Sequence, residues 1–406
     1  MERKILATTY AVNPYKGSED GMGWNFICQI ARHNKVTAIT RKNNRGKIEE
    51  FMKENPNDIY SNINFLYFDL PYWMRFWKKG GRGAMLYYWM WQFGIVSFIK
   101  KQSIDFDIVH NVNFHNDWTP SYLWKLNKPF VWGPVGHHPL IPKQYLESYP
   151  KKYLIKDRLT WLVKLFFWNL TPSLRKTIKK SDHILCMNKS SVEKLSISEK
   201  FSIIPSVATE DFGCELDVSE NDFTIISAGR LVPLKGFDLT INSFALFYHK
   251  LSDEEKLKVT LKIVGSGPEL NFLRDLAKRK GVSDRVVFID WIERKDLLKL
   301  YKTSSLFLFP SHEGAGMVVA EAMSFGLPVV CLDNSGPGEF VDEASGIAIK
   351  ESSYDETVSE LSKGISSIFH KTSLTSRSRA RLRFENQFRW DVRGEQLKKI
   401  YSDLLS

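Results

Sequence analysis

The chain has 406 residues, of which 43% are hydrophobic and 25% charged, as in a globular protein of two or three domains. Four scattered cysteines without a CxxC pair argue against a zinc site and a disulfide framework, and they fit a reducing compartment. The net charge of +11 is uneven, because residues 1–205 hold 31 lysines and arginines against 16 acidic residues, whereas residues 206–406 hold 26 against 30. The first half should therefore face something anionic, either a membrane surface or a nucleic acid.

Neither of the two most apolar runs has the length of a membrane anchor. Residues 5–12 are too short for a signal peptide and lead into a polar loop. Residues 83–99 form the longest uncharged run, of 17 residues, and a spanning helix needs roughly 20. We expect a cytoplasmic protein that is peripheral at the inner face of the cell membrane and does not cross it.

Short apolar strands alternate with helical patterns along both halves of the chain. The strands expected in the first half are 4–10, 35–40, 63–68, 106–112, 128–133, 183–188 and 201–205. Those expected in the second half are 223–229, 258–265, 285–290, 305–310, 328–332 and 346–350. This alternation predicts an α/β protein with two doubly wound, Rossmann-like domains.

The expected domains are residues 1–205 and 206–385, with a join in the polar stretch 206–222. Residues 379–405 are helical in pattern and have no strand after them, so 386–406 should form a helix that crosses back to the first domain. Ligands of such sheets bind outside the carboxyl ends of the strands. The loops that follow the strands are therefore where reactive side chains are expected.

The loop after the first strand reads NPYKGSEDGMGWNF and contains Gly17, Gly21 and Gly23. These glycines make a flexible turn before a helix. Glu19 and Asp20 are candidates for polar contacts with a ligand. A helix start capped by Ser18 explains both acids about as well.

Four histidines lie at or just beyond strand ends of the first half: His110, His115, His137 and His138. A histidine in such a place can orient an acceptor or transfer a proton. The alternative is a structural histidine bonded to the backbone. The DxD sequence at residues 105–107 precedes a strand rather than following one, so we interpret it as a strand entrance and not as a metal site.

Two stretches, 70–93 and 151–180, mix Trp, Tyr and Phe with lysine and arginine. Aromatic and cationic side chains together suit the headgroup region of a membrane. The alternative is a buried aromatic core with a solvated charged edge. Single-stranded nucleic acid fits the same composition, but no nucleic-acid-binding motif is present. The membrane interpretation is favoured because the positive charge is concentrated in the first half of the chain.

Charged and glycine-rich loops also follow the strands of the second half. Arg230 and Lys235 lie in RLVPLKG directly after 223–229, where a guanidinium and an ammonium can grip a diphosphate. The alternative is two surface cations on a turn. Gly265 and Gly267 make a turn into the next helix that could pass close to a nucleobase, or they simply mark a helix start with Pro268 in its first turn.

The segment SHEGAGMVVAEAMSFGLPVV (311–330) places Glu313 on a turn and Glu321 in a helix that begins near Met317. Glycines let the backbone approach a ligand, and a helix N-terminus offers free N–H groups and a partial positive charge. The combination suits a phosphate flanked by hydroxyl groups, with one carboxylate for each polyol. The alternative is a strand–turn–helix with two solvated glutamates.

In combination, GRLVPLKG, IVGSGPEL and HEGAGMVVAEAMSFGLPVV resemble retaining glycosyltransferases of family 4 (group 1), over about residues 223–345. GSEDGMGW is similar to a subgroup that builds cell-surface polysaccharides. The resemblance implies the GT-B fold, in which two Rossmann-like domains face each other across a cleft. It implies a retaining, hexosyltransferase-like enzyme that uses a nucleotide-diphosphate sugar as co-substrate, with no other cofactor and no metal.

The resemblance also implies residue roles. Arg230 and Lys235 would neutralise the donor diphosphate, and Glu313 would bind the donor sugar; these three are the expected catalytic residues. Glu321 would bind the ribose. The remaining positions expected near the donor are Gly17, Gly229, Gly265 and Gly267, the base-flanking Trp291 and Ile292, and the phosphate-binding amides of Gly314, Ala315, Gly316, Met317 and Val318.

The first half departs from the family pattern, which has a single histidine near the donor sugar. Here residues 133–136 occupy that place and His137 and His138 follow, so either could take the role. The resemblance also offers the alternative that the leaving phosphate oxygen takes the acceptor proton, in which case no protein base is needed. The expected partners are a nucleotide sugar, a saccharide acceptor that is lipid-linked, and an anionic membrane surface, with no nucleic acid.

Two alternatives remain: a nucleotide-sugar epimerase or phosphorylase on the same fold, and a non-catalytic, membrane-associated binding protein. The set of Arg230, Lys235, Glu313 and Glu321 argues against an epimerase. The completeness of the donor motif argues against a binding protein.

Overall fold

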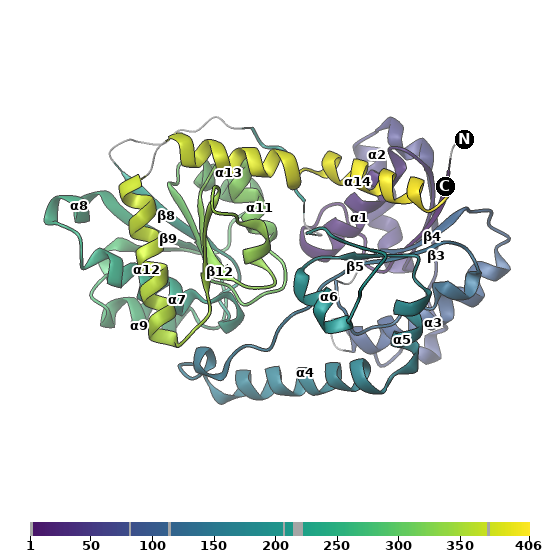
Figure 1. The fold of residues 1–406 in the computed structure, drawn as a ribbon, viewed down its shortest axis with the longest axis horizontal. Helices are drawn as coiled ribbons and strands as arrows, with labels where there is room; N and C mark the ends of the chain where they lie inside the picture. Colours follow the sequence, from purple (N-terminus) through teal and green to yellow (C-terminus); the bar gives the residue numbers. More distant parts are fainter. Residues whose placement is uncertain (1–2, 81–82, 113–114, 206–207, 214–221, 372–373) are drawn as a thin grey trace. The chain divides into compact units, whose positions relative to one another are not determined.

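The computed structural model describes residues 3–80, 83–112, 115–205, 208–213, 222–371 and 374–406. The chain divides into two compact units (Figure 1). The first unit consists of Met1–His137, Leu162–Ser206 and Trp390–Ser406, and the second of His138–Trp161 and Val207–Arg389. Most of the expected join at 206–222 lies outside the described residues, as do Arg82 and Cys214.

The first unit is built on a parallel sheet of seven strands in the order β3-β2-β1-β4-β5-β6-β7. Its central strands are buried on both faces, which explains their near-continuous apolar sequences. The strands are β1 (Lys4–Thr9), β2 (Lys35–Thr40), β3 (Ile63–Tyr67), β4 (Ile108–Val112), β5 (Phe130–Val135), β6 (His183–Cys186) and β7 (Phe201–Ile203).

The second unit contains a parallel sheet of six strands in the order β10-β9-β8-β11-β12-β13. Its strands are β8 (Phe223–Ala228), β9 (Val259–Val264), β10 (Val286–Ile289), β11 (Leu306–Phe309), β12 (Val329–Asp333) and β13 (Gly346–Lys350). In both sheets the strand order reverses beside the first strand, which is the topology of doubly wound domains. The predicted α/β class with two Rossmann-like domains is confirmed.

Helices cover the sheets of both units. Those of the first unit are α1 (Ser18–Ala31), α2 (Arg45–Glu54), α3 (Ala84–Lys101), α5 (Pro172–Lys180), α6 (Lys189–Leu195) and α14 (Trp390–Asp403). Those of the second are α7 (Phe237–Tyr248), α8 (Asp253–Lys258), α9 (Leu270–Arg279), α10 (Arg294–Lys302), α11 (Met317–Ser324), α12 (Tyr354–Lys371) and α13 (Leu374–Gln387). Helix α4 (Lys151–Leu170) begins in the second unit and ends in the first.

The segment His138–Trp161 departs from the expected boundaries, because its contacts group it with the second unit. Tyr145, Tyr149 and Tyr153 are spaced four residues apart, and each hydroxyl bonds a residue of that unit. Tyr145 donates to the Ser352 carbonyl at 2.9 Å. Tyr149 donates at 2.8 Å to the buried carboxylate of Asp238. Hydrogen bonds to buried groups of this kind hold the segment in place.

The segment 379–405, which has a helical pattern in the sequence, belongs to two helices instead of one. The chain leaves helical geometry between α13 and α14, where the amide of Thr209 donates to the Phe388 carbonyl at 2.8 Å. Phe388 is buried and its ring packs against Phe340 at 4.7 Å. Helix α14 then packs against α1 of the first unit. None of the described helices combines the length and hydropathy that a transmembrane helix requires.

Candidate active site

The second unit contains a pocket of about 520 Å³ at the carboxyl ends of its strands. Loops after β8, β9 and β10 line it, together with one residue each from α10 and α11. This is the edge where a doubly wound sheet binds its ligand. Seven positions expected at the donor site line it: Gly229, Arg230, Gly265, Gly267, Trp291, Ile292 and Val318.

Two glycines bring the loops after β8 and β9 into direct backbone contact. Gly265 has a φ of +138°, and a Cβ added there would lie 2.0 Å from the Gly229 carbonyl oxygen. A Cβ on Gly267 would lie 2.3 Å from the Leu231 carbonyl oxygen. Since no side chain fits at either place, the glycines are required for the contact between the loops that line the pocket.

Lys235 and Glu313 form an ion pair in the second unit. Their side chains are only 18% and 19% exposed, and the Lys235 ammonium lies 5.1 Å from the centroid of the Phe309 ring. The amide of His312 donates to the Leu234 carbonyl at 2.9 Å, which ties the two loops together. The predicted catalytic lysine and glutamate are therefore neighbours.

Arg230 is exposed on the wall of the 520 Å³ pocket. Among the residues that the structure describes, no carboxylate pairs with its guanidinium. The pocket wall therefore carries an uncompensated positive charge, which suits an anionic ligand.

The N-terminus of α11 directs backbone amides toward the same edge of the sheet. The amide of Val319 donates to the Gly316 carbonyl at 2.9 Å, whereas Met317 and Val318 occupy the positions whose N–H groups have no acceptor inside a helix. The partial positive charge of the helix end adds to these donors. The amide of Gly314, expected to bind the distal phosphate, has a different partner.

That partner is His138, whose Nδ1 accepts the Gly314 amide hydrogen at 3.0 Å. Because Nδ1 accepts, the neutral ring carries its proton on Nε2. A Cβ on Gly314 would lie 2.5 Å from the same nitrogen, so only glycine leaves room for the ring. Of the two adjacent histidines, His138 lies in the second unit beside Glu313, and His137 lies in the first unit.

Glu321 lies on α11, and its side chain is 6% exposed. Its Oε1 accepts hydrogen bonds from Arg294, at 2.9 Å from Nε and 2.7 Å from Nη2. Burial raises the pKa of Glu321, and the neighbouring guanidinium lowers it by less. Among the described residues, none bonds Oε2, so this oxygen is available to a ligand hydroxyl. Sequence reasoning missed Arg294.

A second residue that sequence reasoning missed supports the Glu313 loop. The Nδ1 of His312 lies 2.7 Å from Glu351 Oε1, and its ring lies 4.7 Å from that of Tyr145. His312 is buried. This pair fixes the backbone immediately before Glu313.

In the first unit, His137 pairs with Asp117 at 2.7 Å through Nδ1. Both side chains are buried, and the ring of Trp168 lies 5.3 Å from that of His137. An aspartate in this position orients the imidazole ring. Asp117 was not among the predicted site residues. His115, also buried, follows β4 with a φ of +31°.

His110 lies inside β4 rather than at its end. Its Nε2 donates to the Gly133 carbonyl at 2.8 Å, and its Nδ1 accepts from the Tyr401 hydroxyl at 2.6 Å. Burial lowers the pKa of His110 to about 3. The structure does not bring this histidine to an accessible edge of the sheet.

Because of His110, the free energy of unfolding is expected to fall as the pH is lowered from about 6.5 toward 3. The pKa of the folded state lies below the unfolded value of 6.5, so in this window the unfolded chain binds a proton that the folded chain does not. The loss is at most about 1.4 kcal/mol per pH unit. His110→Gln should flatten the slope in urea titrations at several pH values; an unchanged slope would show that other groups cause it.

The glycine loop after β1 leads into α1. Gly17 is the N-cap residue, and burial raises the pKa of Glu19 in the first turn. A Cβ on Gly21 would lie 2.1 Å from the Lys16 carbonyl oxygen, and one on Gly23 the same distance from that of Ala11. The latter two glycines therefore serve close packing of the helix on its own loop.

The DxD sequence lies at the entrance to β4. The amide of Lys4 donates to Asp107 at 2.8 Å, and the Lys4 ammonium bonds Asp105 at 2.6 Å. Both carboxylates thus pair with the first residue of β1, the neighbouring strand.

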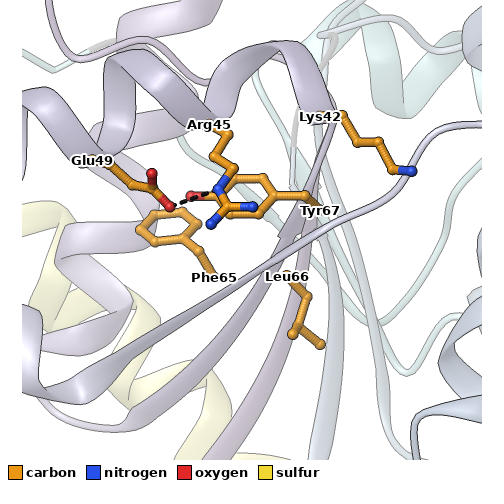
Figure 2. Close-up of a pocket in the computed structure, with 6 residues that line it drawn as sticks. All are labelled: Lys42, Arg45, Glu49, Phe65, Leu66 and Tyr67. Carbon is orange, nitrogen blue, oxygen red and sulfur yellow. Dashed lines mark hydrogen bonds and ion pairs between the residues drawn. The ribbon is translucent and has the colours of Figure 1, made fainter.

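A second pocket, of about 550 Å³, lies at the carboxyl ends of β2 and β3 in the first unit. Figure 2 shows Arg45 over the ring of Tyr67 and beside Glu49, with Leu66 pointing away. The guanidinium carbon lies 5.4 Å from the ring centroid, and Nε lies 2.8 Å from Glu49 Oε1. Phe65 and Lys42 complete the lining. Aromatic faces beside a cation make this a candidate saccharide site.

Comparison with known families decides what the second unit is. Residues 210–383 match the family model described as glycosyl transferases group 1. The second unit is a group 1 glycosyl transferase domain. The family predicted from the motifs after β8, β9 and β11 is thereby confirmed.

Curated relatives resemble part of this chain. The GDP-mannose-dependent monoacylated alpha-(1-6)-phosphatidylinositol monomannoside mannosyltransferase of Corynebacterium glutamicum is 28% identical over 194 residues, which are 46% of this chain and 49% of the relative. The chain spans less than half of the length of the curated relatives that it matches first.

Solved structures resemble this chain over nearly its full length. The apo lipopolysaccharide outer core galactosyltransferase WaaB has a TM-score of 0.65 at 15% identity, covering 98% of this chain and 99% of WaaB. Anabaena Alr3699/HepE in complex with UDP has a TM-score of 0.62 at 16% identity, covering 98% and 100%. At these identities the likeness establishes the fold, and the predicted GT-B fold is confirmed.

Proposed function

We propose that this protein transfers a sugar, with retention of anomeric configuration, from a nucleotide-diphosphate sugar to a saccharide acceptor that is lipid-linked, in surface polysaccharide synthesis. One observation carries the proposal. The uncompensated Arg230, the Lys235–Glu313 pair and the N-terminus of α11 all lie at the carboxyl edge of one group 1 glycosyl transferase domain. Among similar proteins, one is in complex with UDP and another is GDP-mannose-dependent, which supports a nucleoside diphosphate donor.

In the proposed reaction the bond between the anomeric carbon and the diphosphate oxygen breaks, and the leaving oxygen keeps the electron pair. Arg230, Lys235 and the amides of Met317 and Val318 stabilise the negative charge that develops there. The acceptor hydroxyl forms the new bond on the same face of the sugar. Its proton passes to the leaving phosphate, so the donor side needs no protein base. Charge neutralisation by these groups needs no metal.

The geometry of the second unit supports three further donor contacts in this proposal. Glu313 accepts hydrogen bonds from hydroxyls of the sugar, and Oε2 of Glu321 accepts from the ribose. Trp291, 70% exposed at the pocket mouth, stacks on the base. His138 presents Nε2–H beside the sugar-binding loop.

On the acceptor side, the pocket of Figure 2 binds a saccharide ring through Phe65 and Tyr67. The His137–Asp117 pair and Glu19 are the groups of the first unit suited to orient the attacking hydroxyl. The acceptor is presented at an anionic membrane surface on the cytoplasmic side.

The proposal is tested by thermal shift with UDP, GDP and ADP, followed by transfer assays with the matching nucleotide sugars. One nucleoside diphosphate should raise the melting temperature, because a ligand that binds the native state stabilises it. Sugar transfer with retained configuration, read by NMR, supports the proposal. Formation of an epimerised nucleotide sugar, or phosphorolysis without transfer, would identify the rival enzymes. Nucleotide binding without any turnover would identify a binding protein.

A further inference from the structure

Large hydrophobic side chains on the surface gather in two segments of the chain. Among the described residues, 19 large hydrophobic side chains are exposed, and 11 of them lie within 72–93 and 155–170. Isolated exposed apolar residues need no explanation, but a concentration of this kind marks an interaction site. The eleven are Tyr72, Trp73, Phe76, Leu86, Phe93, Ile155, Leu159, Leu162, Val163, Phe166 and Leu170.

Six of these side chains belong to α4 and lie on one face of it. Ile155, Leu159, Leu162, Phe166 and Leu170 follow one another at intervals of four, three, four and four, which is the spacing of a single helix face. Trp168, on the opposite side, is buried. A surface helix normally turns its apolar stripe toward the core. Helix α4 instead exposes one along its whole length, 51–69% of each side chain.

The C-terminal half of α4 lies next to α3 in the first unit. The ring of Phe167 lies 6.3 Å from that of Trp89 on α3. Leu86 and Phe93, two helical turns apart on α3, are both exposed, as are Tyr72, Trp73 and Phe76 in the loop before it. We call the exposed side chains of residues 72–76, of α3 and of the part of α4 that belongs to the first unit (Leu162–Leu170) the α3–α4 face.

The buried aromatic side chains of the same stretches belong to the core. Tyr87, Tyr88 and Trp91 are buried, and Tyr10 packs against all three. The core interpretation of the aromatic stretches therefore holds for these buried residues, and the exposed side chains need a different explanation.

The charge around the α3–α4 face has one sign. Residues 70–104 contain six lysines and arginines and no acidic residue, and residues 151–181 contain nine against the single Asp157. That aspartate is paired with Arg158 at 2.5 Å. A second copy of the same face would bring cations against cations, whereas an anionic surface is complementary. Exposed Tyr and Trp beside lysine are typical of helices that lie in a lipid headgroup region.

We propose that the α3–α4 face rests on the surface of an anionic bilayer, with α4 in the plane of the headgroups and its apolar stripe directed into the acyl boundary. The role of this contact rests on the proposed function, because a lipid-linked acceptor lies in such a surface. The binding itself requires no turnover. It combines apolar insertion with charge attraction, so salt weakens it without abolishing it.

The test is sedimentation of the full chain with two kinds of vesicle, phosphatidylcholine alone and phosphatidylcholine mixed with phosphatidylglycerol. The protein should sediment with the mixed vesicles at least tenfold more strongly. Leu162→Ser combined with Phe166→Ser should reduce that partitioning at least tenfold at low and at high salt. Lys156→Glu should reduce it at low salt only. The control is Leu257→Ser, at a leucine on α8 that is even more exposed than Leu162, and it should sediment like the parent.

Three results would overturn the proposal: partitioning of the double variant equal to that of the parent, equal binding to both vesicle types, or a dimer in ultracentrifugation that the double variant abolishes. Melting temperatures show whether the variants remain folded. The nucleotide thermal shift separates this proposal from the proposed function. Vesicle binding without a nucleotide-induced rise in melting temperature would contradict the proposed sugar transfer and would still support the membrane contact.

Discussion

Replacing Lys235 by alanine is expected to lower kcat for sugar transfer about a hundred- to a thousandfold. The loss of one positioned donor at a developing anion typically costs about 2.7–4 kcal/mol of transition-state stabilisation. The Lys235 side chain is mostly buried against Phe309 and holds Glu313, so its removal also frees the carboxylate that is proposed to bind the sugar. Initial rates at saturating donor measure the effect.

Two further variants make the experiment specific. Lys235→Arg keeps the charge but not the compact ammonium geometry, and it should recover part of the rate. Lys250→Ala removes an exposed lysine of the same unit that lines a different pocket, so its rate should equal that of the parent. If kcat of the Lys235→Ala variant lies within threefold of the parent value, Lys235 has no role in the mechanism.

Replacing Glu321 by alanine is expected to weaken donor binding roughly ten- to a hundredfold, because a hydrogen bond to a charged group contributes about 1.5–3 kcal/mol. The effect should fall on KM and on the Kd of the nucleoside diphosphate, with a smaller change in kcat, since the ribose is remote from the breaking bond. Isothermal titration with the nucleotide identified by thermal shift measures the Kd.

The ion pair with Arg294 provides the control for Glu321. Arg294→Ala removes the partner of Oε1 but leaves the proposed ribose ligand, Oε2, in place. It should therefore weaken nucleotide binding less than Glu321→Ala does. Equal losses in the two variants would mean that Glu321 acts only by holding Arg294, and the ribose contact would have to be abandoned.

The sequence predicts the strands well because each is a short apolar run bounded by turn residues. All thirteen expected strands are present, and the ends differ by a few residues at most, as at 106–112 and Ile108–Val112. Buried parallel strands leave this signal, since both of their faces need apolar side chains. The break between α13 and α14 at Phe388 leaves no such signal in the sequence. It depends on contacts with Phe340 and Thr209, which are far away in the chain.

Several residues of the donor site lie immediately beyond the end of a strand. Gly229, Gly265 and Trp291 follow β8, β9 and β10, and parallel strands bring their carboxyl ends together. The supporting partners lack such a signal. Arg294 and Glu351 are ordinary charged residues in sequence, and only the fold shows that each holds a site residue. Asp117 is missed for the same reason, since His137 lies 20 residues away from it.

The chain passes between the two units four times, at residues 137/138, 161/162, 206/207 and 389/390. Neither unit is therefore one continuous stretch of sequence. A chimera that exchanges donor specificity with a relative must carry His138–Trp161 along with Val207–Arg389, or it will separate Tyr149 from Asp238 and His138 from Gly314. Any recombination between such enzymes at a single junction near residue 206 would inherit mismatched partners on both sides.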